Sequence, residues 1–230
     1  MQSFRKELKF FCTNKELIMI ENCIKSVMKR DEHQKGEYYK IRSVYFDSPD
    51  DVCVRENAAG VGSRHKYRIR TYNKSDQLIL AEIKTKYRET ISKASVKLSG
   101  EQFESIMQRK DLGALLGKGE VLERYLSVLT RGGYHPASIV EYERTAYVYK
   151  PCNVRITFDR NISAGNRFER FFEPDLYSVP LLENGMHVLE VKYDEFLPGF
   201  ISELLRIREL KRTSCSKYYL SRMALGRIWV

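Results

Sequence analysis

Lysine and arginine alternate with apolar residues along several segments of this chain. The clearest case is Lys66-Tyr67-Arg68-Ile69-Arg70, and Glu82-Ile83-Lys84 and Leu189-Glu190-Val191-Lys192 follow the same pattern. Successive side chains of a β-strand point to opposite faces. Each segment therefore predicts a strand with one charged, mainly basic face and one apolar face.

These basic faces need neutralisation, because like charges that lie directly opposite on neighbouring strands repel each other. One interpretation is an ordinary amphipathic strand whose charges face water. The recurrence of the pattern favours a second interpretation, in which the basic faces line the inside of a closed sheet and the apolar faces point outward to helices. A polyanion, with a metal held by the few carboxylates, then neutralises the interior.

The remaining segments predict an α+β fold with a large antiparallel sheet. Helices are expected over residues 13–30, from Ser99 onward, over residues 120–130, and as two short helices from Phe200 to the end. Alternating β-branched and aromatic residues predict the strands. These are Lys40–Phe46, Lys66–Tyr72, Leu78–Lys86, Ser92–Leu98, Ile139–Tyr149, Asn153–Asp159 and His187–Tyr193, with Gly165–Phe172 as a further candidate.

Composition excludes several classes of protein. With 43% hydrophobic residues among 230, the chain can offset the entropy of folding, so disorder is not expected. No stretch approaches the ~20 uncharged apolar residues of a membrane span. The charged N-terminal residues do not resemble a signal peptide. The five cysteines are scattered without a C-x-x-C pair, as in a reduced cytoplasmic protein.

The net charge of +10 indicates a polyanionic partner. Nucleic acid, an anionic membrane surface and a phosphate-rich small molecule all fit this charge. Because the basic residues fall on alternating strand positions, we expect them inside a barrel, where only a narrow polyanion fits. Duplex nucleic acid is therefore not expected as a partner.

Short motifs in a fixed order resemble the triphosphate tunnel metalloenzymes, and within them the VTC domain, a polyphosphate polymerase module. Each motif alone is weak, but together they extend from about Phe4 to Ala224. They are Glu7-Leu8-Lys9, Tyr45-Phe46-Asp47, Lys66-Tyr67-Arg68-Ile69-Arg70, Glu82-Ile83-Lys84, Tyr142-Glu143-Arg144, Val154-Arg155-Ile156-Thr157-Phe158-Asp159, Leu189-Glu190-Val191-Lys192 and Ser216-Lys217-Tyr218.

The resemblance implies one domain over residues 1–230, with a closed antiparallel β-barrel of about eight strands that forms a basic tunnel. It implies a polymerase that moves the γ-phosphate of ATP onto polyphosphate, with Mn²⁺ or Mg²⁺. ATP and polyphosphate are the implied ligands, and a membrane protein is an allowed partner. Two alternatives stay open: a triphosphatase of the same fold, and a binding module without turnover.

The resemblance also implies roles for individual residues. The catalytic cations would be Lys9, Arg68, Arg70, Lys84, Arg144, Arg155 and Lys217. Further substrate contacts would come from Lys93, Lys97, Ser216, Tyr142 and Lys192, with Lys97 added because it shares a face with Lys93. Glu190 is the first candidate metal ligand, and Glu7 and Glu82 follow. Pairing with tunnel lysines is an equal alternative for those two. For Tyr142 the alternatives are base stacking near the tunnel mouth and core packing.

Overall fold

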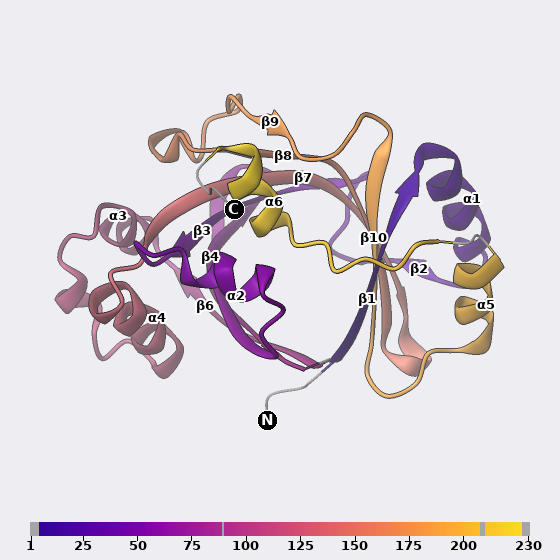
Figure 1. Ribbon diagram of the computed structural model, residues 1–230, viewed down its shortest axis with the longest axis horizontal. Coiled ribbons are helices and arrows are strands. Elements are labelled where there is room, and N and C mark those ends of the chain that lie inside the picture. Colours follow the sequence, from indigo (N-terminus) through magenta and orange to yellow (C-terminus); the bar gives the residue numbers. More distant parts are fainter. Residues whose placement is uncertain (1–4, 89, 208–209, 227–230) are drawn as a thin grey trace.

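The computed structural model describes residues 5–88, 90–207 and 210–226. It has an α+β fold whose strands all pair in antiparallel fashion (Figure 1). The strands are β1 (Arg5–Thr13), β2 (Lys29–Arg30), β3 (Tyr39–Asp47), β4 (Ser63–Tyr72), β5 (Ser75–Tyr87), β6 (Thr90–Leu98), β7 (His135–Tyr149), β8 (Val154–Gly165), β9 (Val179–Pro180) and β10 (Met186–Tyr193). The α-helices are α1 (Asn14–Ile24), α2 (Val52–Ala58), α3 (Gly100–Gln108), α4 (Glu120–Arg131), α5 (Gly199–Ile207) and α6 (Lys217–Ala224).

The ten strands form one sheet in the order β2-β7-β3-β4-β5-β6-β1-β10-β8-β9. Because β7 also pairs with β8, the pairings of eight strands run in a closed circuit from β7 through β3, β4, β5, β6, β1, β10 and β8. We call this circuit the strand ring. Its shortest junction joins β1 to β6 through Arg5↔Ile91 and Lys6↔Thr90.

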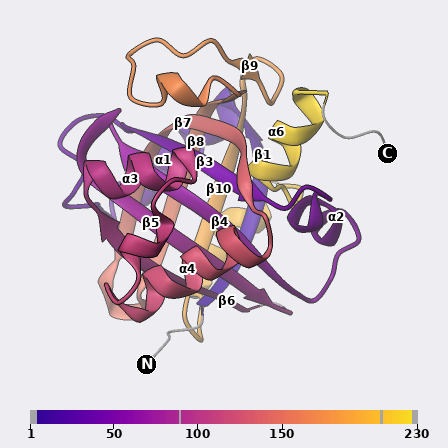
Figure 2. The same cartoon turned by 90° about the vertical axis from the view of Figure 1, so that its left-hand side faces the viewer.

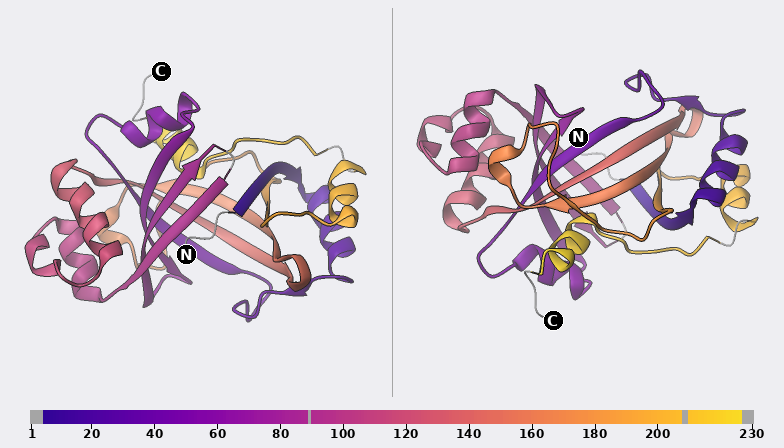
Figure 3. Two further views of the ribbon diagram at one scale, coloured as in Figure 1. Left: turned by 90° about the horizontal axis from the view of Figure 1, so that it is seen from below. Right: turned by 90° about the horizontal axis from the view of Figure 1, so that it is seen from above.

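The apolar faces of the strands point outward and pack against helices in two clusters. Helices α3 and α4 cover strands β3 to β6 (Figure 2). Tyr125 of α4, for example, contacts Phe46 and Tyr67. Helices α1 and α5 cover β1, β8 and β10 at the other end of the molecule (Figure 3). Among the described residues, no helix is long and apolar enough to cross a membrane.

Local sequence explains where the helices begin. Thr13 and Glu16 form a capping box at α1, and Ser99 and Gln102 form another at α3. The Ser216 hydroxyl accepts a hydrogen bond from the Tyr219 amide and caps α6. This last cap also places Ser216 and Lys217 at the helix end that points into the strand ring.

Two predicted elements were wrong in extent or kind. The predicted helix 13–30 ends at Ile24, because the chain then turns to bury Met28 and extends as β2 against β7. The candidate strand Gly165–Phe172 is not formed, since residues 168–170 make a 3₁₀ turn. Arg42 holds this turn by donating to the carbonyl oxygens of Phe171 and Glu173, at 2.6 and 2.7 Å. Helix α2 was not predicted.

Candidate active site

A basic passage runs through the strand ring. Three adjoining cavities of about 360, 70 and 450 Å³ share lining residues and form it. Its cations come from seven strands and from α6, and they include Lys9, Lys66, Arg68, Arg70, Lys84, Lys93, Arg144, Arg155, Lys192 and Lys217. The alternation of the strands therefore separates the basic faces, which line the passage, from the apolar faces, which contact the helices.

Asp159 fixes two of these cations in the wall of the middle cavity. Its carboxylate accepts two hydrogen bonds from the Arg144 guanidinium, at 2.6 and 2.7 Å, and lies 2.6 Å from the Lys217 ammonium. The Tyr142 ring lies beside both, with its centroid 4.9 Å from the Lys217 nitrogen and 5.1 Å from the Arg144 guanidinium. The fully buried Asp159 carboxylate thus orients both cations before any ligand binds.

Glu190 faces four cations from the same cavity. Its carboxylate oxygens lie 3.2 Å from the ammonium groups of Lys192 and Lys217, 3.6 Å from that of Lys9 and 3.7 Å from the Arg144 guanidinium. Burial raises the pKa of this carboxyl group, but the surrounding cations, Lys217 first, outweigh burial and hold its pKa well below the ordinary value. Glu190 is therefore ionised and available as an oxygen ligand.

Glu7 holds a second set of cations toward the ends of the passage. It lies 3.3 Å from the ammonium groups of Lys84 and Lys192 and 3.7 Å from that of Lys9. These cations, Lys84 first, hold the Glu7 pKa below its ordinary value although burial opposes them. Burial is also the main reason why the pKa of Lys84 falls to about 7, with Lys9 and Lys192 adding to it and Glu7 opposing it.

Glu82 forms ion pairs with basic residues, chiefly the arginines of β4. Its carboxylate lies 2.6 Å from Arg68, 2.8 Å from Lys93 and 3.8 Å from Arg70. Glu82 is fully buried and is not among the residues that line the three cavities. Among the alternatives for Glu82, the pairing with basic residues is thus the one that its contacts support.

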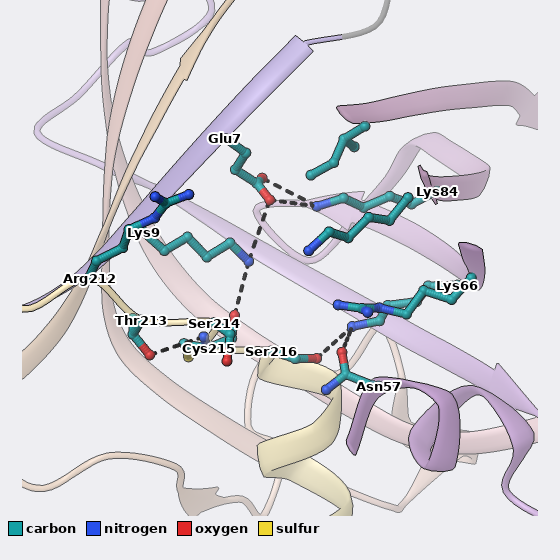
Figure 4. Close-up of a pocket in the computed structure, with 13 residues that line it drawn as sticks. Glu7, Lys9, Asn57, Lys66, Lys84, Arg212, Thr213, Ser214, Cys215 and Ser216 are labelled. Carbon is teal, nitrogen blue, oxygen red and sulfur yellow. Dashed lines mark hydrogen bonds and ion pairs between the residues drawn. The ribbon is translucent and has the colours of Figure 1, made fainter. Parts of the chain in front are cut away.

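Lys66 lines the passage although it was not among the predicted site residues. Its ammonium donates to Asn57 Oδ1 at 2.8 Å and to Ser216 Oγ at 2.6 Å, both neutral (Figure 4). Burial first, and then Lys9 and Lys84, lower its pKa well below the ordinary value. The signal was present in the sequence, because Lys66 shares its strand face with Arg68 and Arg70.

Replacing Lys66 with methionine is expected to weaken triphosphate binding by at least about tenfold. The free energy of unfolding should stay the same or rise by about 1 kcal/mol, because the variant removes a desolvated charge that has no carboxylate partner. Calorimetric titration and urea unfolding would measure the two quantities. The matched control is Lys97→Met, which alters an exposed lysine. Unchanged triphosphate affinity in the Lys66 variant would contradict its assignment.

The structure places Lys97 differently from the expectation, and for Tyr142 its contacts support one of the two alternatives, packing in the interior. Lys97 shares a strand face with Lys93 but lies opposite Leu80 and is exposed, outside the residues that line the passage. Tyr142 lies in the middle cavity, is 3% exposed and accepts a hydrogen bond from Arg70 at 3.1 Å. Lys217 and Arg144 occupy the surroundings of its ring, so it is not at a mouth where a base would stack.

The two ends of the passage differ in chemistry. At one end Arg64 and Arg212 join Lys66, together with the hydroxyl-bearing segment 213–216 (Figure 4). At the other end Tyr39 lies 6.0 Å from Tyr72, between ring centroids, and its hydroxyl group accepts a hydrogen bond from Arg155. Both ends carry cations that suit a phosphate chain, and the second end adds aromatic surface.

A buried carboxylate outside the passage positions α6. Asp47 accepts hydrogen bonds from the amides of Cys53 and Val54 at the start of α2, and from the Tyr218 hydroxyl at 2.6 Å. The Tyr218 ring in turn stacks on Tyr45, with centroids 4.9 Å apart, in the passage wall. Asp47 thus connects α2, β3 and α6, and so fixes the end of α6 that carries Lys217.

The acidic donors suit a divalent cation that is shared with a substrate. Mg²⁺ and Mn²⁺ take oxygen ligands and usually combine one or two carboxylates with water and phosphate oxygens. Glu190 lines the middle cavity and Glu7 both end cavities. In the described part of the chain no group of three or more His, Cys, Asp and Glu residues would hold a metal by itself. The donor set therefore fits a metal held jointly by carboxylate and phosphate.

Solved structures share this fold at low sequence identity. A Bacillus halodurans protein described as a candidate adenylate cyclase superposes with a TM-score of 0.54 at 13% identity, covering 94% of this chain and 95% of that chain. A Vibrio parahaemolyticus protein with the same description gives 0.52 at 12% identity, covering 96% and 98%. These likenesses concern the fold alone. No curated protein sequence matches the chain significantly.

A family model identifies the chain more closely. The model of the VTC domain matches residues 4–225, which include every strand and helix of the described structure. The matched range also contains the alternating basic strands and the Ser216-Lys217 end of α6. The chain therefore belongs to the VTC domain family.

Proposed function

We propose that this protein is a polyphosphate polymerase that transfers the γ-phosphate of ATP to a growing polyphosphate chain. In this proposal residues 1–230 form a single tunnel domain, and the strand ring is the closed barrel around the tunnel. The observation that carries the proposal is the basic passage, whose cations continue from one end cavity through the middle cavity to the other. A polymer requires an exit as well as a substrate site.

The chemistry of phosphoryl transfer requires positioning and charge stabilisation more than covalent work by the protein. Tight ion pairs hold some of the cations in fixed positions. Asp159 orients Arg144 and Lys217, and Glu82 orients Arg68. These three cations line the middle cavity, where they would hold phosphate oxygens. Arginine suits two-pronged contacts to phosphate, whereas lysine acts as a point charge.

A second set of ion pairs is looser, and a substrate could displace these pairs when it binds. Glu7 and Glu190 lie 3.2–3.7 Å from Lys9, Lys84 and Lys192, which is longer than a strong charge-assisted hydrogen bond. An entering triphosphate would displace these contacts and take over the lysines. Glu190, and Glu7 with it, would hold Mn²⁺ or Mg²⁺ together with the phosphates. The metal would neutralise charge that develops on the transferring group.

Phosphorus NMR of the pure protein with ATP and Mn²⁺ tests this function. The expected result is the signal of internal phosphates of a polymer that grows at the expense of ATP. Orthophosphate as the only product would contradict the polymerase and favour a triphosphatase of the same fold. Binding without any turnover would favour a polyphosphate-binding module. A reaction without added metal, in the presence of a chelator, is the control for metal dependence.

A further inference from the structure

A groove of about 600 Å³ lies beside the Arg155 end of the basic passage. Residues 27–33, which follow α1, form one wall of this groove. Residues 148–151, at the turn between β7 and β8, form the other. Arg155 lines both the groove and the end cavity of the passage, so the two spaces meet at its side chain. We call this space the outer groove.

The pairing of the strands places the outer groove on the same sheet face as the passage. Lys192 of β10 lies opposite Arg155 of β8, Arg155 lies opposite Val148 of β7, and Val148 lies opposite Lys29 of β2. Residues that are directly opposite in an antiparallel pair point to the same side. The first two of these pairings lie within the strand ring, and the third, from β7 to β2, leads outside it. The passage wall therefore continues outward by one strand spacing, about 4.8 Å.

Cations without strong partners lie along this extension. Lys29 is exposed and has no ion pair with a described residue. Lys150 lies 3.8 Å from Glu32, but their side chains are 79% and 82% exposed, and such pairs contribute little. At the inner end, Arg155 is held by Asp31 and donates to the Tyr39 hydroxyl at 3.2 Å. Both lysines are therefore available to an anion that leaves the passage past Arg155.

We infer that the outer groove binds the segment of a linear polyphosphate chain that extends beyond the basic passage. The inference rests on the proposed function and adds a second binding segment outside the ring. A repeating polyanion suits point charges spaced along one line, because each phosphate is equivalent to the next. Asp31 and Glu32 also line the groove, and their carboxylates are paired with Arg155 and Lys150.

Comparing three ligands with two variants tests this site. Calorimetric titration would measure the affinities of inorganic triphosphate, which the proposed function places in the passage, of ATP and of a long-chain polyphosphate. The test variant is Lys29→Ala with Lys150→Ala. The matched control is Lys110→Ala with Lys118→Ala, two exposed lysines in the α3–α4 region at the opposite end of the molecule (Figure 1). Circular dichroism would check that each variant is folded.

The wild-type protein and the control are expected to bind the long chain at least about tenfold more tightly than triphosphate. The test variant should lose most of this preference and keep its triphosphate affinity. The logarithm of the long-chain affinity falls linearly with the logarithm of the salt concentration, and the slope should become shallower by about one for each lysine removed.

Other outcomes separate the inference from the proposed function. If the wild type binds triphosphate but the test variant keeps its preference for the long chain, the outer groove is not the site and the proposed function stands. If the test variant instead loses affinity for ATP and not for triphosphate, the groove holds the nucleoside, which also overturns the inference. A wild-type protein that binds neither phosphate ligand would overturn both.

Discussion

Replacing Glu190 with glutamine is expected to lower turnover of ATP by at least about 100-fold. The variant keeps the size of the side chain and removes its charge, and with it the ionised oxygen ligand in the middle cavity. Triphosphate affinity should stay the same or rise, because a negative charge is removed from beside Lys9, Lys192 and Lys217. The effect therefore falls on kcat and not on KM.

The fold of this variant should survive, since each cation keeps another carboxylate. Lys217 retains Asp159, and Lys9 and Lys192 retain Glu7. Steady-state kinetics, triphosphate titration and thermal unfolding would be measured on the same preparation. Glu104→Gln, a change of the same kind at an exposed helix position, is the control. Full turnover in the Glu190 variant would contradict both the polymerase and the triphosphatase hypotheses. Phosphate binding without turnover in the wild type and the variant alike would favour a binding module.

The alternation of residue types predicted much of this architecture. Arg68 and Arg70 face the passage and Ile69 faces the helices, as the period of two requires. The same rule extends to Lys66, which lines two cavities although only its strand neighbours were singled out. Alternation fixes the face of a side chain but not its depth along the strand. Lys97 shows this limit, because it shares a face with Lys93 and lies outside the passage.

Local sequence patterns could not predict the contacts between segments that lie far apart in the chain. Helix α2 has only seven residues, and the buried carboxylate of Asp47 caps its first amides. The same carboxylate binds Tyr218, which lies near the other end of the chain. The role of Asp159 similarly depends on Lys217, which a separate helix brings to it. Short motifs locate these residues, but only the folded chain shows which of them meet.

Replacing Asp159 with alanine is expected to lower the free energy of unfolding by about 3–5 kcal/mol. The carboxylate is fully buried and satisfies Arg144 with two hydrogen bonds and Lys217 with a third contact. Its removal leaves two buried cations with Glu190 alone, at 3.2 and 3.7 Å. Urea unfolding would measure the loss, and Asp159→Asn, which keeps a hydrogen-bond acceptor at the same place, should lose less.

Bound phosphate should reverse part of this loss. A ligand that binds only the folded state stabilises it by an amount that grows with its concentration relative to Kd, about 2.7 kcal/mol at 100-fold excess over Kd. In the alanine variant a triphosphate would meet Arg144 and Lys217 with their main carboxylate removed, so its phosphates would supply the missing negative charge. We therefore expect saturating triphosphate to raise the unfolding midpoint of Asp159→Ala more than that of the wild type. An equal shift in the two proteins would mean that triphosphate does not bind at this part of the passage.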